Sequence, residues 1–167
     1  MRLELSGLDE AGFIQRFGGV YEHSPWIAQA AFQQGLPAQI SVAELSLAMM
    51  TVVASAGRDQ LMALIKAHPD LAGKAAIHGE LTEESTSEQA GAGIHECTPE
   101  EFERFQTFNT AYKEKFGFPF IMAVKGSNRH LILAAFETRL AHEADAEFAQ
   151  AIAEINKIAR FRLEAMT

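Results

Sequence analysis

The chain has little cysteine and no long apolar run. Cys97 is the single cysteine among 167 residues, so no disulfide can form within the chain, which is typical of a reducing cytosol. The longest apolar stretch, about residues 45–56, is too short and too interrupted to span a bilayer. The N-terminus shows no apolar signal core, and the C-terminal EAMT is not a peroxisomal address. We therefore expect a cytoplasmic protein.

Basic residues are also scarce. Fourteen Lys and Arg stand against 22 Asp and Glu, which gives a net charge of −8. Nucleic acids and anionic membranes both bind basic surfaces, so we expect neither as a partner. If the ligand is an anion, the protein must concentrate positive charge locally.

Strand signals, repeats, low-complexity tracts and linkers are missing as well. The apolar period is helical, and FIMAV at 120–124 is the only stretch that resembles a strand. A lone strand has nothing to pair with. With 48% hydrophobic and 22% charged residues, the composition is that of an ordinary globular protein. The sequence predicts one all-α domain over residues 1–167, a bundle of about seven to nine helices.

Capping residues mark several helix ends. Ser24 precedes Pro25 as an N-cap would, Thr98 precedes Pro99 in the same way, and Gly117 suits a C-cap. Either Ser127 or Asn128 is expected to cap the helix that follows. Residues 70–84 are expected to be mainly loop. Helices are expected over about 9–18, 25–35, 41–57, 57–68, from 85 onward, 98–117, 128–142 and 145–163.

A histidine interrupts one apolar helix face. Leu61, Leu64, Ile65 and His68 follow the i, i+3, i+4, i+7 spacing of one face, and Pro69 then ends the helix. His68 therefore takes the place of a buried apolar residue. It is either a satisfied core residue or part of a site.

An arginine interrupts the last helix in the same way. Phe148, Ile152, Ile155 and Ala159 recur on one face, and the next position on that face is Arg162. A buried guanidinium must be paired, since an unmatched buried charge costs several kcal/mol. The partner is either an internal carboxylate or an anionic ligand, which the planar fork binds bidentately.

Three further features have two interpretations each. Ser85 with Glu88 forms a capping box, or, with Gln89, a helix end that offers an acceptor and an amide to a urea-like ligand. Asn109 fits a buried structural amide more readily than a site residue. FGFPF at 116–120 is either a core plug or an aromatic wall for a flat heterocycle.

Metal and nucleophile motifs are missing. The candidate ligands His68, His78, His95, Glu96 and Cys97 lack the spacing of known zinc motifs. We find no glycine-rich phosphate loop and no G-x-S-x-G elbow. We therefore expect no metal site.

Four blocks of sequence resemble a known family in order and spacing. They are AHPDLAGK at 67–74, ESTSEQAGAG at 84–93, FNTAYKEKFGFPFIMAVKG at 108–126 and EINKIARFRL at 154–163. Together they resemble the 2-oxo-4-hydroxy-4-carboxy-5-ureidoimidazoline (OHCU) decarboxylases of purine breakdown, over nearly the whole chain. The missing peroxisomal tail makes the chain similar to the bacterial members.

The resemblance implies an all-α carboxy-lyase, usually a homodimer, that needs no cofactor. It implies conversion of the ureidoimidazoline formed from uric acid into (S)-allantoin and CO2. The family's catalytic histidine falls on His68, expected to act as general acid or base. The implied substrate-binding residues are Pro69, Ser85, Thr86, Ser87, Glu88, Gln89, Phe120, Ile121, Met122, Ala123, Val124 and Arg162.

Two other functions remain as alternatives. One is a non-catalytic helical module that binds a ligand or a protein, in which His68 and Arg162 are structural. The other is a metal-dependent hydrolase that uses His68, His78 and His95.

Overall fold

The computed structural model describes residues 1–73 and 81–167 of the chain. Its contacts divide it into two compact units, Met1–Ala67 with Ile155–Thr167, and His68–Glu154. Within the described residues there are eight α-helices and a single two-stranded sheet, so the predicted all-α class and helix number are confirmed. The single-domain expectation stays a prediction.

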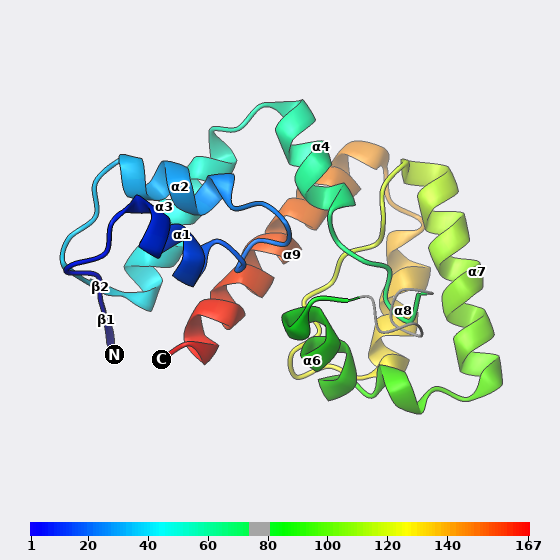
Figure 1. Cartoon of the computed structure of the whole chain (residues 1–167). Helices are drawn as coiled ribbons and strands as arrows, with labels where there is room; N and C mark the ends of the chain where they lie inside the picture. The colour runs from blue at the N-terminus through cyan, green and yellow to red at the C-terminus, as the bar shows by residue number, and fades with distance from the viewer. Residues whose placement is uncertain (74–80) are drawn as a thin grey trace. The chain divides into compact units, whose positions relative to one another are not determined.

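The first unit contains four helices and a small sheet (Figure 1). The helices α1 (Glu10–Phe17), α2 (Trp26–Gln33) and α3 (Val42–Ala54) pack in sequence, and α4 (Arg58–Lys66) follows. Strands β1 (Arg2–Glu4) and β2 (Gln39–Ser41) pair antiparallel. The sequence did not predict these strands, because three residues are too few to show an alternating pattern.

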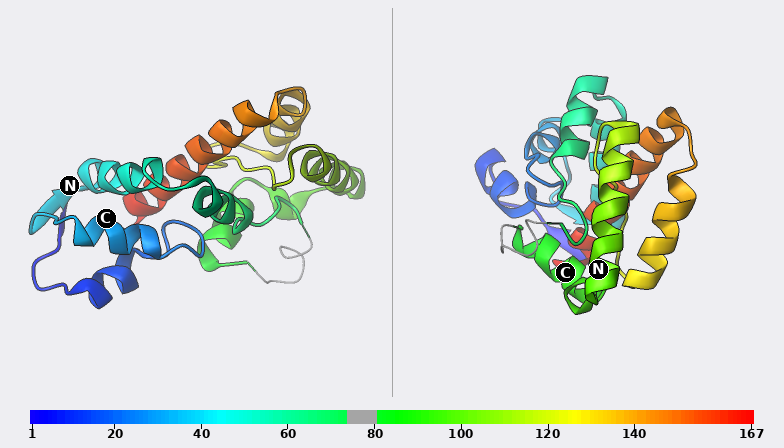
Figure 2. Two further views of the ribbon diagram at one scale, coloured as in Figure 1. Left: turned by 90° about the horizontal axis from the view of Figure 1, so that it is seen from above. Right: turned by 90° about the vertical axis from the view of Figure 1, so that its right-hand side faces the viewer.

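The second unit contains α6 (Glu83–Gly91), the 3-10 helix η1 (Ile94–Glu96), α7 (Pro99–Phe116) and α8 (Arg129–Arg139). The helices α7 and α8 lie side by side, as the views of Figure 2 show. The long helix α9 (Ala144–Ala165) gives its residues up to Glu154 to this unit and the remainder to the first. None of the helices in the described part of the chain is long and apolar enough to cross a membrane.

Local capping chemistry explains most of the helix ends. Thr98 caps α7 with a complete capping box and Gly117 ends α7 in the left-handed conformation, both as predicted. Of the two N-caps expected for α8, Ser127 or Asn128, the structure has Asn128. The Ser24 prediction is wrong, because its hydroxyl donates to the carbonyl of Glu22 and α2 has no side-chain N-cap. The helix after Asn128 ends at Arg139, earlier than the predicted residue 142.

Gly117 offers a test of the α7 terminus. Its φ is +78°, which an alanine adopts only at a cost of about 1 kcal/mol, although a Cβ there would meet no atom within 4 Å. We expect Gly117→Ala to lower the free energy of unfolding by about 1 kcal/mol in urea titrations followed by circular dichroism.

Gly91 is the matched control. A Cβ added to Gly91 would also meet no atom within 4 Å, but this residue is the last of α6 and its φ is not positive. Gly91→Ala should leave stability unchanged or raise it by up to about 1 kcal/mol. Equal losses in both variants would show that the left-handed φ is not the cause.

Candidate active site

His68 lies just beyond α4. The helix ends at Lys66, and the N–H of Ala67 still donates to the carbonyl of Ala63 at 3.0 Å. The side chain of His68 is 8% exposed, so its predicted burial is confirmed. The helix ends two residues earlier than predicted, because Pro69 disfavours helical backbone at the residue before it.

The helix α6 carries the predicted Ser85–Gln89 segment, but it begins earlier than expected. Thr82 is its N-cap, and the Thr82 hydroxyl accepts from the N–H of Ser85 at 3.2 Å. The prediction that Ser85 is the N-cap is therefore wrong, because Thr82 supplies the same capping chemistry three residues earlier. Ser85 and Gln89 are buried one turn apart, Glu88 is half-buried, and Thr86 and Ser87 are exposed.

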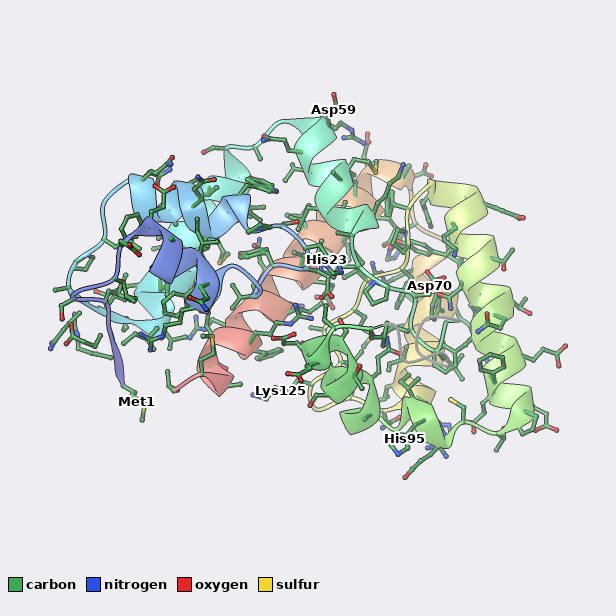
Figure 3. All side chains as sticks on the ribbon, in the orientation of Figure 1. Met1, His23, Asp59, Asp70, His95 and Lys125 are labelled. Carbon is green, nitrogen blue, oxygen red and sulfur yellow. The ribbon has the colours of Figure 1, made fainter. Side chains whose placement is uncertain are left out.

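Gln89 binds the backbone that follows His68. Its Oε1 accepts from the N–H of Ala72 at 3.1 Å, and its Nε2 donates to the carbonyl of Asp70 at 3.3 Å. The turn is tight, because a Cβ on Gly73 would lie 2.7 Å from the Cβ of Asp70. Gln89 thus joins α6 to the loop 68–73, whose Asp70 is labelled in Figure 3.

Two further amides reach the same loop from α7. Asn109 Nδ2 donates to the carbonyl of Leu71 at 2.9 Å, and Gln106 Nε2 donates to the carbonyl of Ala72 at 2.6 Å. The predicted burial of Asn109 is confirmed, since its side chain is 3% exposed. Gln106 was missed by sequence reasoning, and its only signal is its place three residues before Asn109 on one face of α7. We call Gln89, Gln106 and Asn109 the amide clamp.

The loop also carries strain and charge. Ala72 has a φ of +53°, a left-handed conformation that costs a residue with a Cβ about 1–2 kcal/mol. Lys113, one turn beyond Asn109, pairs with the carboxylate of Asp70 at 2.7 Å. Such a backbone persists only when its surroundings hold it, and here side chains of α6 and α7 do so.

The predicted segment 120–124 is anchored by its aromatic side chain. The ring of Phe120 is 1% exposed and stacks on Phe136 with centroids 3.7 Å apart, and it meets Tyr112 edge-on. Phe118 also packs against Tyr112. The core-plug interpretation of FGFPF is therefore the one that fits, since these rings fill the interior of the second unit.

The backbone of this segment is held by buried charges. Arg139 Nη1 donates to the carbonyl of Ile121 at 2.6 Å, and its Nε donates to the fully buried carboxylate of Glu147 at 2.8 Å. The hydroxyl of Tyr112 donates to the same carboxylate. Burial, and then this hydrogen bond to Glu147, raise the pKa of Tyr112 above its ordinary value, so the hydroxyl keeps its proton.

The two half-buried residues of the segment, Met122 and Ala123, are less enclosed than Phe120 and Ile121. The N–H of Ala123 lies 3.4 Å from Glu154 Oε1, which accepts from it. The N–H of Ser127 donates to the carbonyl of Val124 at 2.9 Å and closes the turn toward α8. The segment therefore has a defined path, fixed at both ends and in its middle.

Arg162 belongs to the first unit, where it is buried and paired. Its Nη2 lies 2.8 Å from Glu22 Oε2, and its Nη1 donates to the carbonyls of Gly19 at 3.3 Å and Val20 at 3.5 Å. Arg162 and Glu22 are 6% and 2% exposed. The internal carboxylate that the sequence left open as its partner is thus present, and a substrate role for Arg162 stays a prediction.

Metal ligands do not gather in the part of the chain that the structure describes. Among residues 1–73 and 81–167, no three His, Cys, Asp or Glu side chains lie close enough to hold a metal ion. His78 lies outside the described residues. Burial, and then the charge of Glu101, raise the pKa of the Cys97 thiol, which disfavours the reactive thiolate.

A cavity of about 530 Å³ adjoins α6 in the second unit. Thr86 and Gln89 line it, but Ile94, Cys97 and Phe102 make it mainly apolar. His68 is not among the described residues that line it. A polar ureido substrate needs convergent hydrogen-bonding groups, so we do not assign the substrate to this cavity.

Comparison with known proteins decides the family. The family model described as OHCU decarboxylase matches residues 6–164. This chain belongs to the OHCU decarboxylase family. It is 41% identical to the 2-oxo-4-hydroxy-4-carboxy-5-ureidoimidazoline decarboxylase of Haloferax volcanii, over 96% of this chain and 92% of that protein.

Other members extend the comparison. The uric acid degradation bifunctional protein of Bacillus subtilis is 38% identical over 96% of this chain, which matches 31% of that longer protein. The crystal structure of (S)-allantoin synthase superposes with a TM-score of 0.75 at 31% identity, covering 96% of this chain and 52% of that chain. The resemblance inferred from the sequence is confirmed, and with it the expected class of enzyme, a decarboxylase.

The buried pair Arg139–Glu147 provides a test of how the 120–124 segment is held. Removing one partner of a buried pair leaves an uncompensated charge, which costs about 3–5 kcal/mol. We expect Arg139→Met to lower the free energy of unfolding by about that amount in urea titrations, and to release the segment from α8.

Arg104→Met is the matched control. Arg104 pairs with Glu137 at 2.9 Å, but both side chains are more than half exposed. An exposed pair contributes less than about 1 kcal/mol, so this variant should remain close to the wild type. A loss for Arg139→Met as small as the loss for Arg104→Met would refute the anchoring role.

Proposed function

We propose that this chain decarboxylates 2-oxo-4-hydroxy-4-carboxy-5-ureidoimidazoline to (S)-allantoin and CO2 during uric acid degradation. The match of the OHCU decarboxylase family model to residues 6–164 carries this proposal. The histidine of the AHPD block is present at His68, is buried, and heads a loop that two helices hold in place.

The substrate's own chemistry explains why the proposal includes no cofactor. The carbon that loses CO2 also carries a hydroxyl group, and the neighbouring ring carbon is part of an imine. Electrons released when the C–C bond breaks flow into that imine, so the substrate is its own electron sink. The protein must therefore position the ring, move a proton and impose handedness.

His68 is the group proposed to move the proton. Histidine is the side chain most often used as a general acid or base near neutral pH. Delivery of the proton to one face of the ring would give a single enantiomer, whereas spontaneous decay gives racemic allantoin. His68 would act at the hydroxyl or at the carbon that receives the proton.

The remaining predicted residues are proposed to bind the substrate. Glu88 and Gln89 would hold the ureido and ring amides. Gln89 can bind both the loop and the substrate. Its Oε1 can accept a second hydrogen bond, since it has two lone pairs, and its Nε2 can donate a second one, since it has two hydrogens. The backbone of residues 120–124 would bind the polar edge of the ring. Pro69 and the Ser85–Ser87 stretch would complete the contacts.

Arg162 is proposed to bind an anionic or carbonyl oxygen of the substrate. A carboxylate held too firmly would resist leaving as CO2, so Arg162 would orient the substrate more than it drives the reaction. The pairing of Arg162 with Glu22 supports an orienting role, because a guanidinium already paired with one carboxylate attracts the substrate's carboxylate less strongly.

His68→Ala tests the proposal directly. The substrate is generated in situ from urate, and circular dichroism follows the optically active product. We expect the wild type to form (S)-allantoin and His68→Ala to lower kcat by about 100-fold or more, because a general acid or base contributes at least that factor. The folded fraction of each variant is measured alongside.

His130→Ala is the matched control, since its side chain is 70% exposed. It should retain full activity. If His68→Ala retains activity per folded molecule and loses mainly stability, the chain is the non-catalytic module instead, or uses another proton donor. Loss of activity on exhaustive chelation would favour the metal-dependent hydrolase.

We also propose that the chain is cytoplasmic and forms a homodimer, as the family resemblance implies. The dimer has a simple test. Sedimentation equilibrium should give about twice the 18.3 kDa of one chain. A mass near 18.3 kDa at micromolar concentration would contradict the dimer and leave the proposed reaction untouched.

A further inference from the structure

The left-handed residue in the loop after His68 is an alanine, although a glycine follows it. Ala72 has a φ of +53°, whereas Gly73 does not have a positive φ. An alanine disfavours this conformation because its Cβ crowds the backbone. Both backbone polar groups of Ala72 form hydrogen bonds with side chains. The N–H donates to Gln89, and the carbonyl accepts from Gln106.

Three consecutive carbonyl groups of this loop accept hydrogen bonds from the amide clamp. Those of residues 70, 71 and 72 accept from Gln89, Asn109 and Gln106 in turn, at 3.3, 2.9 and 2.6 Å. Buried carbonyls are normally satisfied by a helix or a sheet. Here three side chains take that role over three successive residues, so the path of the loop is set by α6 and α7.

The clamp acts close to His68 in the chain. Only Pro69 separates His68 from Asp70, and the proline ring fixes φ at that residue. A shift of the backbone at residues 70–72 therefore also moves the backbone of His68.

We propose that Gln106 and Asn109 are positioning residues for His68, which hold the left-handed backbone at Ala72 and so aim the imidazole at the substrate. Neither residue is among those assigned to the catalytic histidine or to substrate contacts. The inference rests on the proposed function, since it needs the reaction of His68 as its readout.

A positioning role predicts a loss of kcat more than of affinity. Misplacing a proton donor slows the chemical step and leaves ground-state substrate contacts largely intact. Gln106→Leu keeps the approximate shape of the side chain and removes the donor. We expect kcat to fall between about tenfold and 100-fold, with KM changed by less than about threefold.

The substitution Ala72→Gly provides a background that separates positioning from plain stability. Glycine adopts positive φ without the steric penalty, so the backbone needs the clamp less. Ala72→Gly alone should keep kcat near the wild-type value. In that background, Gln106→Leu should lower kcat by clearly less than it does in the wild type, by about threefold.

Gln150→Leu on α9 is the matched control for the same chemical change, at a half-buried position outside the clamp. It should leave kcat and KM unchanged. All variants are assayed by circular dichroism of allantoin formed from urate, with rates corrected for the folded fraction. Asn109→Leu repeats the test at the second donor if Gln106→Leu does not fold.

The outcomes separate the inference from the function. A wild type that forms no optically active allantoin refutes the proposed function. An active wild type with unchanged kcat per folded molecule in both Gln106→Leu and Asn109→Leu refutes only the positioning role. Equal losses of kcat with and without Ala72→Gly would also overturn it, because holding the left-handed backbone would then not be the cause.

Discussion

The hydrogen bonds from three side-chain amides to the carbonyls of residues 70–72 are the interaction that gives the candidate site its form. Without them the loop after Pro69 would bury the unsatisfied carbonyls of Leu71 and Ala72 and a strained alanine, each costing about 1–3 kcal/mol. With them, side chains of α6 and α7 hold the backbone of the loop in one conformation. We infer that this loop positions His68, which lies outside any helix.

Buried charge plays a similar role elsewhere in the chain. Arg139 ties Ile121 to Glu147 in the second unit, and Arg162 ties the carbonyls of Gly19 and Val20 to Glu22 in the first. Well-packed apolar residues would often stabilise a core as much as such pairs do. These pairs also fix the path of the backbone, because each guanidinium donates hydrogen bonds to carbonyl groups, which a hydrophobic side chain cannot do.

The sequence predicted those features that depend on neighbouring residues. The caps Thr98, Gly117 and Asn128 act within one turn of themselves, and the structure has each of them. The predictions for Ser24 and Ser85 failed for two different local reasons. The Ser24 hydroxyl donates to the nearby carbonyl of Glu22 instead of capping α2, and Thr82 caps α6 three residues before Ser85. The three-residue strands were missed because their pairing joins segments far apart in the chain.

The site was predictable in part. The burial of His68 and Arg162 follows from helical periodicity, and both are buried. Their chemical roles came from the family resemblance, and periodicity alone left a core residue and an ion pair as open alternatives. Gln106 could not be found, because its acceptor lies 34 residues away in a loop without regular structure.

The most direct test of the central claim is a titration of the isotope-labelled wild type with (S)-allantoin, followed by NMR. If the clamped loop carries His68 to the substrate, the imidazole nitrogens of His68 and the backbone amide of Ala72 will shift together, with one saturation curve. If both signals stay unchanged while the product saturates its site, the loop after Pro69 does not form part of that site.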